Sequence, residues 1–218
     1  MVVRPRVGVL ALQGGVREHL EFLDKAGADA VRVRKPQELQ GLDGIVIPGG
    51  ESTTISKLLV SLQMFQPLKT LIEDGLPTWG TCAGMILLAD RVEGAAEGQV
   101  SFGALDATIK RNAFGSQTQS HEERLRIKGI DGPVHAVFIR APVVERVGPE
   151  VEVLGRSARR ASVPASGSGA GSESADTGGA IVAIAQGRVL ATSFHPELSD
   201  DLTMHRFFLD HFVAGKAN

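Results

Sequence analysis

The sequence of 218 residues has one cysteine, no tyrosine and no long apolar run. The single cysteine, Cys82, excludes an internal disulfide framework and any site built from several thiolates. No apolar stretch approaches the roughly 18 residues of a membrane span. The apolar run at residues 7–12 is also too short for the core of a signal peptide. We therefore expect a cytoplasmic protein whose thiol stays reduced.

The sequence also has no large excess of positive or negative charge. Lysine and arginine number 23 against 25 aspartate and glutamate residues, so the formal charge is −2. Without a broad basic face, binding to nucleic acid or to an anionic membrane surface is not expected. The length suits a single domain, residues 1–218, and 43% apolar residues are enough for a packed core.

Short apolar runs alternate with segments of helical spacing in the first half of the chain. The pattern predicts strands at 7–12, 30–33, 44–47 and 78–81, and helices at 16–25, 52–59, 65–73 and 85–89. This alternation is typical of an α/β fold with a mainly parallel sheet and helices on both faces. Later strands at 104–110, 123–128 and 136–139 lack intervening helices and predict an antiparallel or mixed part. A hairpin about Gln186-Gly187 joins strands at 180–185 and 188–194, and a helix follows at 202–212.

One segment departs from this pattern. Residues 161–180 are mostly alanine, serine and glycine. They offer too little apolar surface to offset the entropy of ordering, so we expect a mobile surface loop at about 157–179. Within it, Arg159-Arg160-Ala161-Ser162 resembles a basic-directed kinase site, and a chance match in a loop of this composition is the favoured interpretation.

The motif Gly80-Thr81-Cys82-Ala83-Gly84 lies between a predicted strand and a predicted helix. It has the pattern of a nucleophile elbow with cysteine in the place of serine. A sharp turn of this kind needs small neighbours, and a helix N-terminus beneath the sulfur favours the thiolate. The alternative, a buried structural cysteine, stays open on this motif alone.

A second motif, Ser193-Phe194-His195-Pro196-Glu197, follows the last predicted strand. In an extended segment, residues two apart point to the same side, so Glu197 is expected to hold one ring nitrogen of His195 while the other faces a thiol. The two motifs together predict a Cys-His-Glu triad in which His195 acts as base and then as acid. A surface turn with an incidental His and Glu is the alternative.

Gly49 and Gly50 follow the strand at 44–47, and Ser52 is expected to cap the next helix. Adjacent glycines leave backbone N–H groups free to face an oxyanion, although a tight turn fits the spacing equally well. The Walker lysine pattern is missing, so a phosphate loop is disfavoured. Of the other histidines, two lie six apart on the last predicted helix and share no face (His205 and His211), and three lie in unrelated segments (His19, His121 and His135). We therefore expect no metal site, and we expect no cofactor.

Six motifs, in order along the chain, resemble class I glutamine amidotransferases and, more closely, the glutaminase subunits of pyridoxal 5′-phosphate synthases. The motifs are Val9-Leu10-Ala11-Leu12-Gln13-Gly14, Pro48-Gly49-Gly50-Glu51-Ser52-Thr53-Thr54, Gly80-Thr81-Cys82-Ala83-Gly84, Arg111-Asn112-Ala113-Phe114-Gly115, Phe138-Ile139-Arg140-Ala141-Pro142 and Ser193-Phe194-His195-Pro196-Glu197. There are two departures: Gly15 stands where many relatives have alanine, and the 157–179 segment is longer than usual.

The resemblance implies a three-layer α/β glutaminase that works with a separate synthase subunit. Cys82 would attack the glutamine carboxamide, a glutamyl thioester would form, and ammonia would pass to the synthase. The resemblance further implies that Gly49, Gly50, Glu51 and Ser52 contact glutamine or its oxyanion, and that Arg111, Ile139 and Arg140 line the glutamine pocket. Arginine suits a carboxylate through charge-assisted hydrogen bonds. An ordinary surface salt bridge is the alternative for either arginine.

Two other functions stay open. A glutaminase serving a different ammonia acceptor would carry the same triad. A non-catalytic regulatory binding protein could share the scaffold, although such a role would not require Cys82, His195 and Glu197 together.

Overall fold

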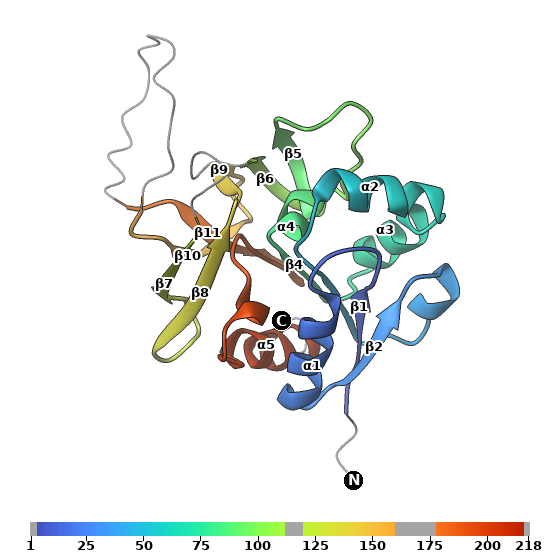
Figure 1. Ribbon diagram of the computed structural model, residues 1–218, viewed down its shortest axis with the longest axis horizontal. Coiled ribbons are helices and arrows are strands. Elements are labelled where there is room, and N and C mark those ends of the chain that lie inside the picture. Colours follow the sequence, from blue (N-terminus) through green and yellow to red (C-terminus); the bar gives the residue numbers. More distant parts are fainter. Residues whose placement is uncertain (1–3, 112–119, 160–177, 216–218) are drawn as a thin grey trace.

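The computed structural model describes residues 4–111, 120–159 and 178–215, and all structural statements refer to these residues. Ten of their strands form one mixed sheet, and two more form a separate hairpin. Figure 1 shows the sheet running through the middle of the molecule with helices on both sides. This is the three-layer α/β arrangement that the alternating pattern predicts.

One half of the sheet is parallel. Its five strands lie side by side in the order β2 (Asp29–Val33), β1 (Arg6–Leu10), β3 (Gly44–Ile47), β4 (Thr78–Thr81) and β12 (Val189–Thr192). All residues of β3, β4 and β12 are buried, because a strand covered by helices on both faces has no solvent side. The predicted bounds of β3 and β4 are confirmed.

The other half of the sheet is mainly antiparallel. It contains β11 (Ile181–Gln186), β10 (Glu152–Arg156), β9 (Val143–Val147), β6 (Leu105–Lys110) and β5 (Ala89–Glu93), of which only β5 and β6 pair in parallel. The predicted hairpin between β11 and β12 is confirmed, and Gly187 supplies a φ of 55° at its turn. Strands β5, β9 and β10 were not predicted, because charged residues interrupt their apolar pattern.

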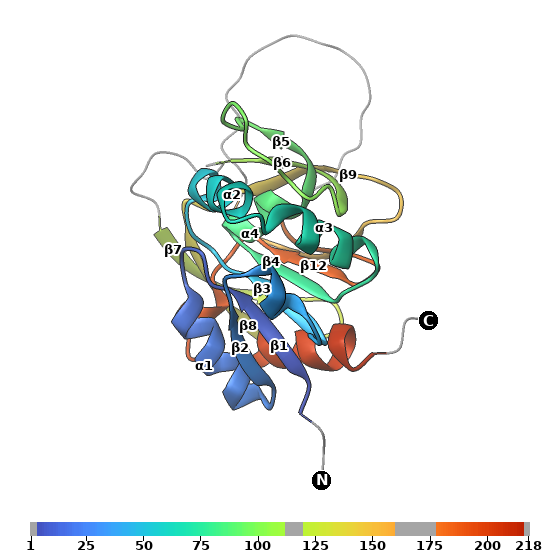
Figure 2. The same cartoon turned by 90° about the vertical axis from the view of Figure 1, so that its right-hand side faces the viewer.

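Helices cover both faces of the sheet, as Figure 2 shows. One face carries α1 (Val16–Ala26) and α5 (Thr203–Phe207), which a π-helical turn extends through Phe208–Val213. The opposite face carries α2 (Ser52–Ser61), α3 (Phe65–Glu73) and α4 (Ala83–Leu88). Two hydrophobic clusters fill the two spaces between helices and sheet. In the described ranges, no helix has the length and apolar character needed to cross a membrane.

A separate antiparallel hairpin, β7 (Ser120–Arg126) and β8 (Pro133–Ile139), packs beside the mixed half of the sheet. It lies next to β10 and β11 in Figure 1, and Ile127 forms a bridge with Gly155 of β10. The strands expected at 123–128 and 136–139 belong to this hairpin, so they lie outside the main sheet. Short 3-10 turns at Pro36–Leu39 and Pro196–Leu198 complete the described elements.

Two local expectations are wrong. Ser52 is the first residue of α2 and makes no capping hydrogen bond, because Glu51 occupies the cap position. The second concerns only the start of the loop expected at about 157–179: Ser157 is buried, and its hydroxyl donates a 2.6 Å hydrogen bond to Glu123, while the loop itself stays a prediction. Residues 160–177, including Ser162 of the kinase-like motif, lie outside the described residues.

Candidate active site

Cys82 occupies a sharp turn between β4 and α4. Its backbone has a φ of 47° and a ψ of −101°, a conformation that is strained for a residue with a Cβ and that occurs mainly at functional sites. The flanking glycines permit the turn. A Cβ on Gly80 would lie 2.5 Å from the Gly84 carbonyl carbon, and a Cβ on Gly84 would lie 2.0 Å from the Ile47 carbonyl oxygen. The turn therefore has the geometry of a nucleophile elbow.

His195 and Glu197 form the hydrogen-bonded pair that the spacing suggested. Nδ1 of His195 lies 2.8 Å from Oε1 of Glu197, and both residues are buried. The expectation that an extended backbone pairs these two residues is wrong. Glu197 belongs to the 3-10 turn Pro196–Leu198, and this turn brings its carboxylate back to the imidazole.

The sheet brings the two motifs together from distant parts of the chain. Strands β4 and β12 are parallel neighbours with Thr81 opposite Thr192, so both motifs leave the sheet at the same edge. The Cys82 N–H donates a 2.8 Å hydrogen bond to the Thr192 carbonyl. Beyond β12, the His195 N–H donates to the Val137 carbonyl of β8, also at 2.8 Å. The β7–β8 hairpin thus holds the histidine from the other side.

The electrostatics of these side chains favour a charged histidine. Burial opposes protonation of His195, but hydrogen bonds with Cys82 and Glu197 outweigh it and raise the pKa of His195 to about 10. Burial also opposes ionisation of Glu197, but the neighbouring His19 and His195 lower the pKa of this carboxyl. A carboxylate beside a protonated imidazole is therefore the state expected near neutral pH. This state fixes the ring and keeps a proton available beside Cys82.

The loop containing Gly49 and Gly50 lies against both motifs. A Cβ on Gly49 would lie 2.3 Å from Cε1 of His195 and 3.3 Å from Cβ of Cys82, so only glycine fits there. The expectation that both glycine N–H groups are free is wrong for Gly49, whose N–H donates a 3.0 Å hydrogen bond to Oγ1 of Thr81. The Gly50 N–H has no acceptor among the described residues.

The turn after β1 supports this loop. The Glu51 N–H donates a 2.7 Å hydrogen bond to the side-chain oxygen of Gln13, and the Gly15 N–H donates to the Gly49 carbonyl. Gly14 has a φ of 102°, and a Cβ there would lie 1.7 Å from the Gly49 oxygen. The motif at residues 9–14 therefore contributes to the site by shaping the glycine loop.

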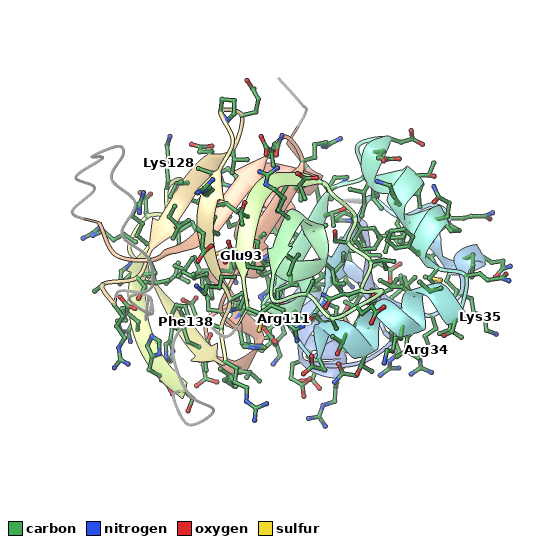
Figure 3. The ribbon with its side chains drawn as sticks, turned by 90° about the horizontal axis from the view of Figure 1, so that it is seen from above. Arg34, Lys35, Glu93, Arg111, Lys128 and Phe138 are labelled. Carbon is green, nitrogen blue, oxygen red and sulfur yellow. The ribbon has the colours of Figure 1, made fainter. Side chains whose placement is uncertain are left out.

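Arg111 and Glu51 form an ion pair across the site. A guanidinium nitrogen of Arg111 lies 3.2 Å from Oε1 of Glu51, and another donates to the Gly94 carbonyl and to Gln99. Seen from above, Arg111 lies near the middle of the molecule, between the hairpin that carries Phe138 and the helices beyond it (Figure 3). Residues 112–115 of the same motif lie outside the described residues.

Ile139 and Arg140 come from the end of β8. The Ile139 carbonyl oxygen lies 3.9 Å from the Cys82 sulfur. Arg140 has a φ of 47°, which is a second strained backbone position at the site, and its side chain is exposed. Ser52 is buried, and its hydroxyl has no partner in the described part of the chain. A buried polar atom without a partner is uncommon and is expected where a ligand binds.

Sequence reasoning missed two histidines and a threonine. The sequence gives no reason to connect His19 of α1 with His205 of the last helix, but their ring nitrogens lie 3.0 Å apart. His19 also contacts Oγ1 of Thr81 at 3.2 Å and Oε2 of Glu197 at 3.3 Å. Neither spacing nor a local motif joins residues 186 positions apart in the sequence. Only the burial of His19 on the inner face of α1 could have drawn attention to it.

A cysteine in a strained elbow beside a buried His–Glu pair, at one edge of a three-layer α/β sheet, is the arrangement of enzymes that act through a cysteine nucleophile. Comparison with known proteins gives the family. Residues 9–214 match the model of the SNO glutamine amidotransferase family, and the chain belongs to this family.

Two relatives and one solved structure are similar over nearly the full length. The pyridoxal 5′-phosphate synthase subunit PdxT of Rhodococcus jostii (strain RHA1) is 53% identical over 210 residues, which cover 96% of this chain and 98% of the relative. The protein of the same name from Acidothermus cellulolyticus (strain ATCC 43068 / DSM 8971 / 11B) is 55% identical over 212 residues, covering 97% and 95%. A crystal structure of a glutamine amidotransferase is 44% identical, covers 96% and 99%, and has a TM-score of 0.81.

Proposed function

We propose that this protein is the glutaminase subunit of a pyridoxal 5′-phosphate synthase. It hydrolyses L-glutamine to L-glutamate and ammonia, and a separate synthase subunit uses the ammonia for pyridoxal 5′-phosphate (vitamin B6) biosynthesis. Family membership and the name shared by the relatives support the assignment. The observation that carries the chemistry is the 2.8 Å His195–Glu197 pair beside the strained Cys82 elbow.

The reaction divides into two acyl-transfer steps. The proton of the Cys82 thiol is held by His195, and the resulting thiolate attacks the side-chain carboxamide carbon of glutamine. The C–N bond then breaks as His195 gives that proton to the departing nitrogen. Ammonia and a glutamyl thioester result. His195 then takes a proton from a water molecule, whose oxygen attacks the thioester carbon and releases glutamate and the thiolate. Glu197 keeps the imidazole oriented throughout and stabilises its positive charge whenever His195 is protonated.

Two backbone N–H groups are suited to the oxyanion of the tetrahedral intermediates. The Gly50 N–H has no acceptor among the described residues, and Ala83 is the first residue of α4, so its N–H has no partner within the helix. The N–H of the residue after the nucleophile is a common oxyanion donor in elbows of this type. Because Gly49 has no side chain, His195 and Cys82 can pack directly against its backbone.

The polar side chains around the elbow bind the charged groups of the glutamine substrate in this proposal. Arg111 and Arg140 supply positive charge for its α-carboxylate, since an arginine can form two parallel hydrogen bonds to that group. Glu51 accepts from its α-ammonium group, and the unpartnered hydroxyl of Ser52 supplies a further polar contact. The exposed Ile139 side chain and its carbonyl line the side next to the sulfur.

The proposal includes a single glutaminase domain, because both hydrophobic clusters pack on the same sheet. It also includes a hetero-oligomer with the synthase subunit, and a cytoplasmic location in which the Cys82 thiol stays reduced. Side chains, backbone groups and water supply both steps, and we propose no cofactor.

The decisive experiment measures glutamate release with and without the synthase subunit. Glutamine labelled with ¹⁵N in the side-chain amide is supplied with ribose 5-phosphate and glyceraldehyde 3-phosphate, the substrates that the family resemblance implies for the synthase. The ¹⁵N content of the pyridoxal 5′-phosphate is then measured. We expect the label in the product, and we expect Cys82→Ala to abolish both glutamate release and labelling.

Other results would favour the alternatives. Glutamate release without transfer of ¹⁵N would indicate a different ammonia acceptor. If Cys82 stays unreactive towards a diazo-oxo analogue of glutamine even with the synthase bound, the protein is a non-catalytic binding protein. Undiminished release by Cys82→Ala would exclude the proposed nucleophile.

A further inference from the structure

His19 of α1 lies directly behind the catalytic carboxylate, although no motif places it there. Its side chain is fully buried, and its Nε2 lies 3.3 Å from Oε2 of Glu197. Oε1 of the same carboxylate is taken by His195. Oε2 is buried and makes no conventional hydrogen bond within the described residues. His19 Nε2 is the polar atom placed to interact with it.

The surroundings of His19 determine which ring nitrogen carries the proton. If Nδ1 carried it, the lone pair of Nε2 would face the carboxylate at 3.3 Å and be repelled. With the proton on Nε2, that N–H faces both Oε2 of Glu197 and Oγ1 of Thr81. Nδ1 then accepts a hydrogen bond from Nε2 of His205 at 3.0 Å. The geometry therefore selects an Nε2–H tautomer of His19, and His205 fixes it.

His205 is held for this task by aromatic neighbours. Its ring centroid lies 5.0 Å from those of Trp79 and Phe22, and the residue is fully buried. Burial lowers the pKa of His19 and of His205, which favours the neutral form of both rings. A neutral pair can donate to the carboxylate without cancelling the charge that Glu197 presents to His195.

His19 also reaches the glycine loop through Thr81. Its Nε2 lies 3.2 Å from Oγ1 of Thr81, and this oxygen accepts the Gly49 N–H at 3.0 Å. Gly49 precedes Gly50, the residue whose N–H is assigned to the oxyanion. One imidazole thus touches the carboxylate end of the triad and, through one hydroxyl, the glycine loop that packs against His195 and Cys82.

We infer that His19 is a positioning residue that orients the Glu197 carboxylate and the Gly49–Gly50 loop together, with its tautomer set by His205. The inference rests on the proposed glutaminase function. Because His19 touches neither Cys82 nor the expected substrate position, its loss should lower kcat and leave the KM for glutamine nearly unchanged. This split separates positioning from substrate binding.

The test uses the full chain with saturating synthase subunit and compares three substitutions of His19. Leucine keeps much of the volume and removes the N–H. Glutamine places an amide N–H near the position of Nε2, and asparagine is too short to reach it. We expect His19→Leu and His19→Asn to lower kcat about 10- to 100-fold, by analogy with buried groups that orient metal ligands. We expect His19→Gln to recover most of the loss.

Leu23→Val is the matched control, because Leu23 lies on the same helix and is equally buried, but its side chain belongs to the hydrophobic cluster and carries no polar group. It should leave kcat within about twofold of the wild type. If His19→Leu does not fold, the comparison of the glutamine and asparagine variants, which have similar polarity, decides the question. Thermal unfolding of each variant is measured alongside.

Two results would overturn the inference: a kcat of His19→Leu or His19→Asn within threefold of the wild type, or equal losses in the glutamine and asparagine variants. The second result would mean that packing of the ring matters and the N–H does not. A wild-type protein that releases no glutamate would instead overturn the proposed function, so the two failures are distinguishable.

Discussion

The two sides of the site differ sharply in their exposure to water. On the sheet side, the side chains of His195 and Glu197 are only 11% and 1% exposed. On the opposite side, Glu51 is 54% exposed and its ion-pair partner Arg111 is 18% exposed. Electrostatic interactions are stronger where water is excluded. The buried side is therefore suited to the chemistry, and the exposed side to capture and release of a small charged substrate.

The two sides also come from different structural elements. The buried side is built on the carboxyl ends of the parallel strands β3, β4 and β12, with α1 beneath it. The exposed side comes from the start of α2, the end of β6 and the end of β8. Substitutions on the first side should act mainly on kcat, and those on the second mainly on KM.

The largest effect is expected from the buried side. His195→Gln keeps a polar side chain but removes the group that transfers the proton, so kcat should fall by about a thousandfold or more. The KM for glutamine should change little. Steady-state glutamate release with the synthase subunit measures both constants. A loss of kcat below tenfold would show that another group transfers the proton.

The buried side should also make stability depend on pH. The pKa of His195 is raised to about 10 in the folded protein, against an ordinary value near 6.5 when the chain is unfolded. The folded state therefore holds the proton more tightly, and this contribution is complete below about pH 6.5 and is lost as the pH rises towards 10. We expect it to be on the order of a few kcal/mol.

Denaturant unfolding at pH 6.5 and pH 9.5 measures this contribution, with His195→Gln as the reference. The wild type should lose more stability than the variant between these two pH values. Equal losses in the two proteins would mean that the proton is not bound more tightly in the folded state. The raised pKa of His195 would then not explain how the buried side differs from the exposed side.

A moderate effect is expected on the exposed side. Arg111→Met removes the charge while keeping a long side chain, and the KM for glutamine should rise roughly tenfold, in line with the loss of a charge-assisted hydrogen bond. The kcat should stay within about threefold. Lys128→Met is a matched control, since Lys128 pairs with Glu152 away from the elbow. If Arg111→Met lowers kcat alone, the division of labour between the two sides is wrong.

The smallest effect tests how tightly the buried side is packed. A Cβ on Gly15 would lie 2.9 Å from Oε1 of Glu197, so Gly15→Ala must displace that carboxylate by a few tenths of an ångström. We expect kcat to change about two- to threefold with KM unchanged. Gly27→Ala is unsuitable as a control because Gly27 has a φ of 107°. Ala26→Gly, at the far end of α1, is preferable, and it should leave kcat unchanged.

The parts of the structure that the sequence predicts also differ from those that it does not. The parallel strands and the elbow are visible in the sequence because buried strands give continuous apolar runs and a sharp turn requires small residues. The charged and interrupted strands β5, β9 and β10 give no such signal, and their pairing depends on neighbours far along the chain. The pairing of His195 with Glu197 was predicted from an extended backbone, but a 3-10 turn forms it. A spacing of two residues fits both conformations, so the sequence does not distinguish them.

The sequence by itself determined the kind of chemistry. A single cysteine in a glycine-flanked turn, together with a histidine and a glutamate two residues apart, identifies the reactive groups because reactive groups and tight turns are local properties. The tertiary structure alone decided how these groups are supported. The contact of His19 with Glu197, the use of the Gly49 N–H by Thr81 and the pairing of Arg111 with Glu51 all join residues far apart in the chain. Such contacts depend on how strands and helices pack, and no local pattern encodes them.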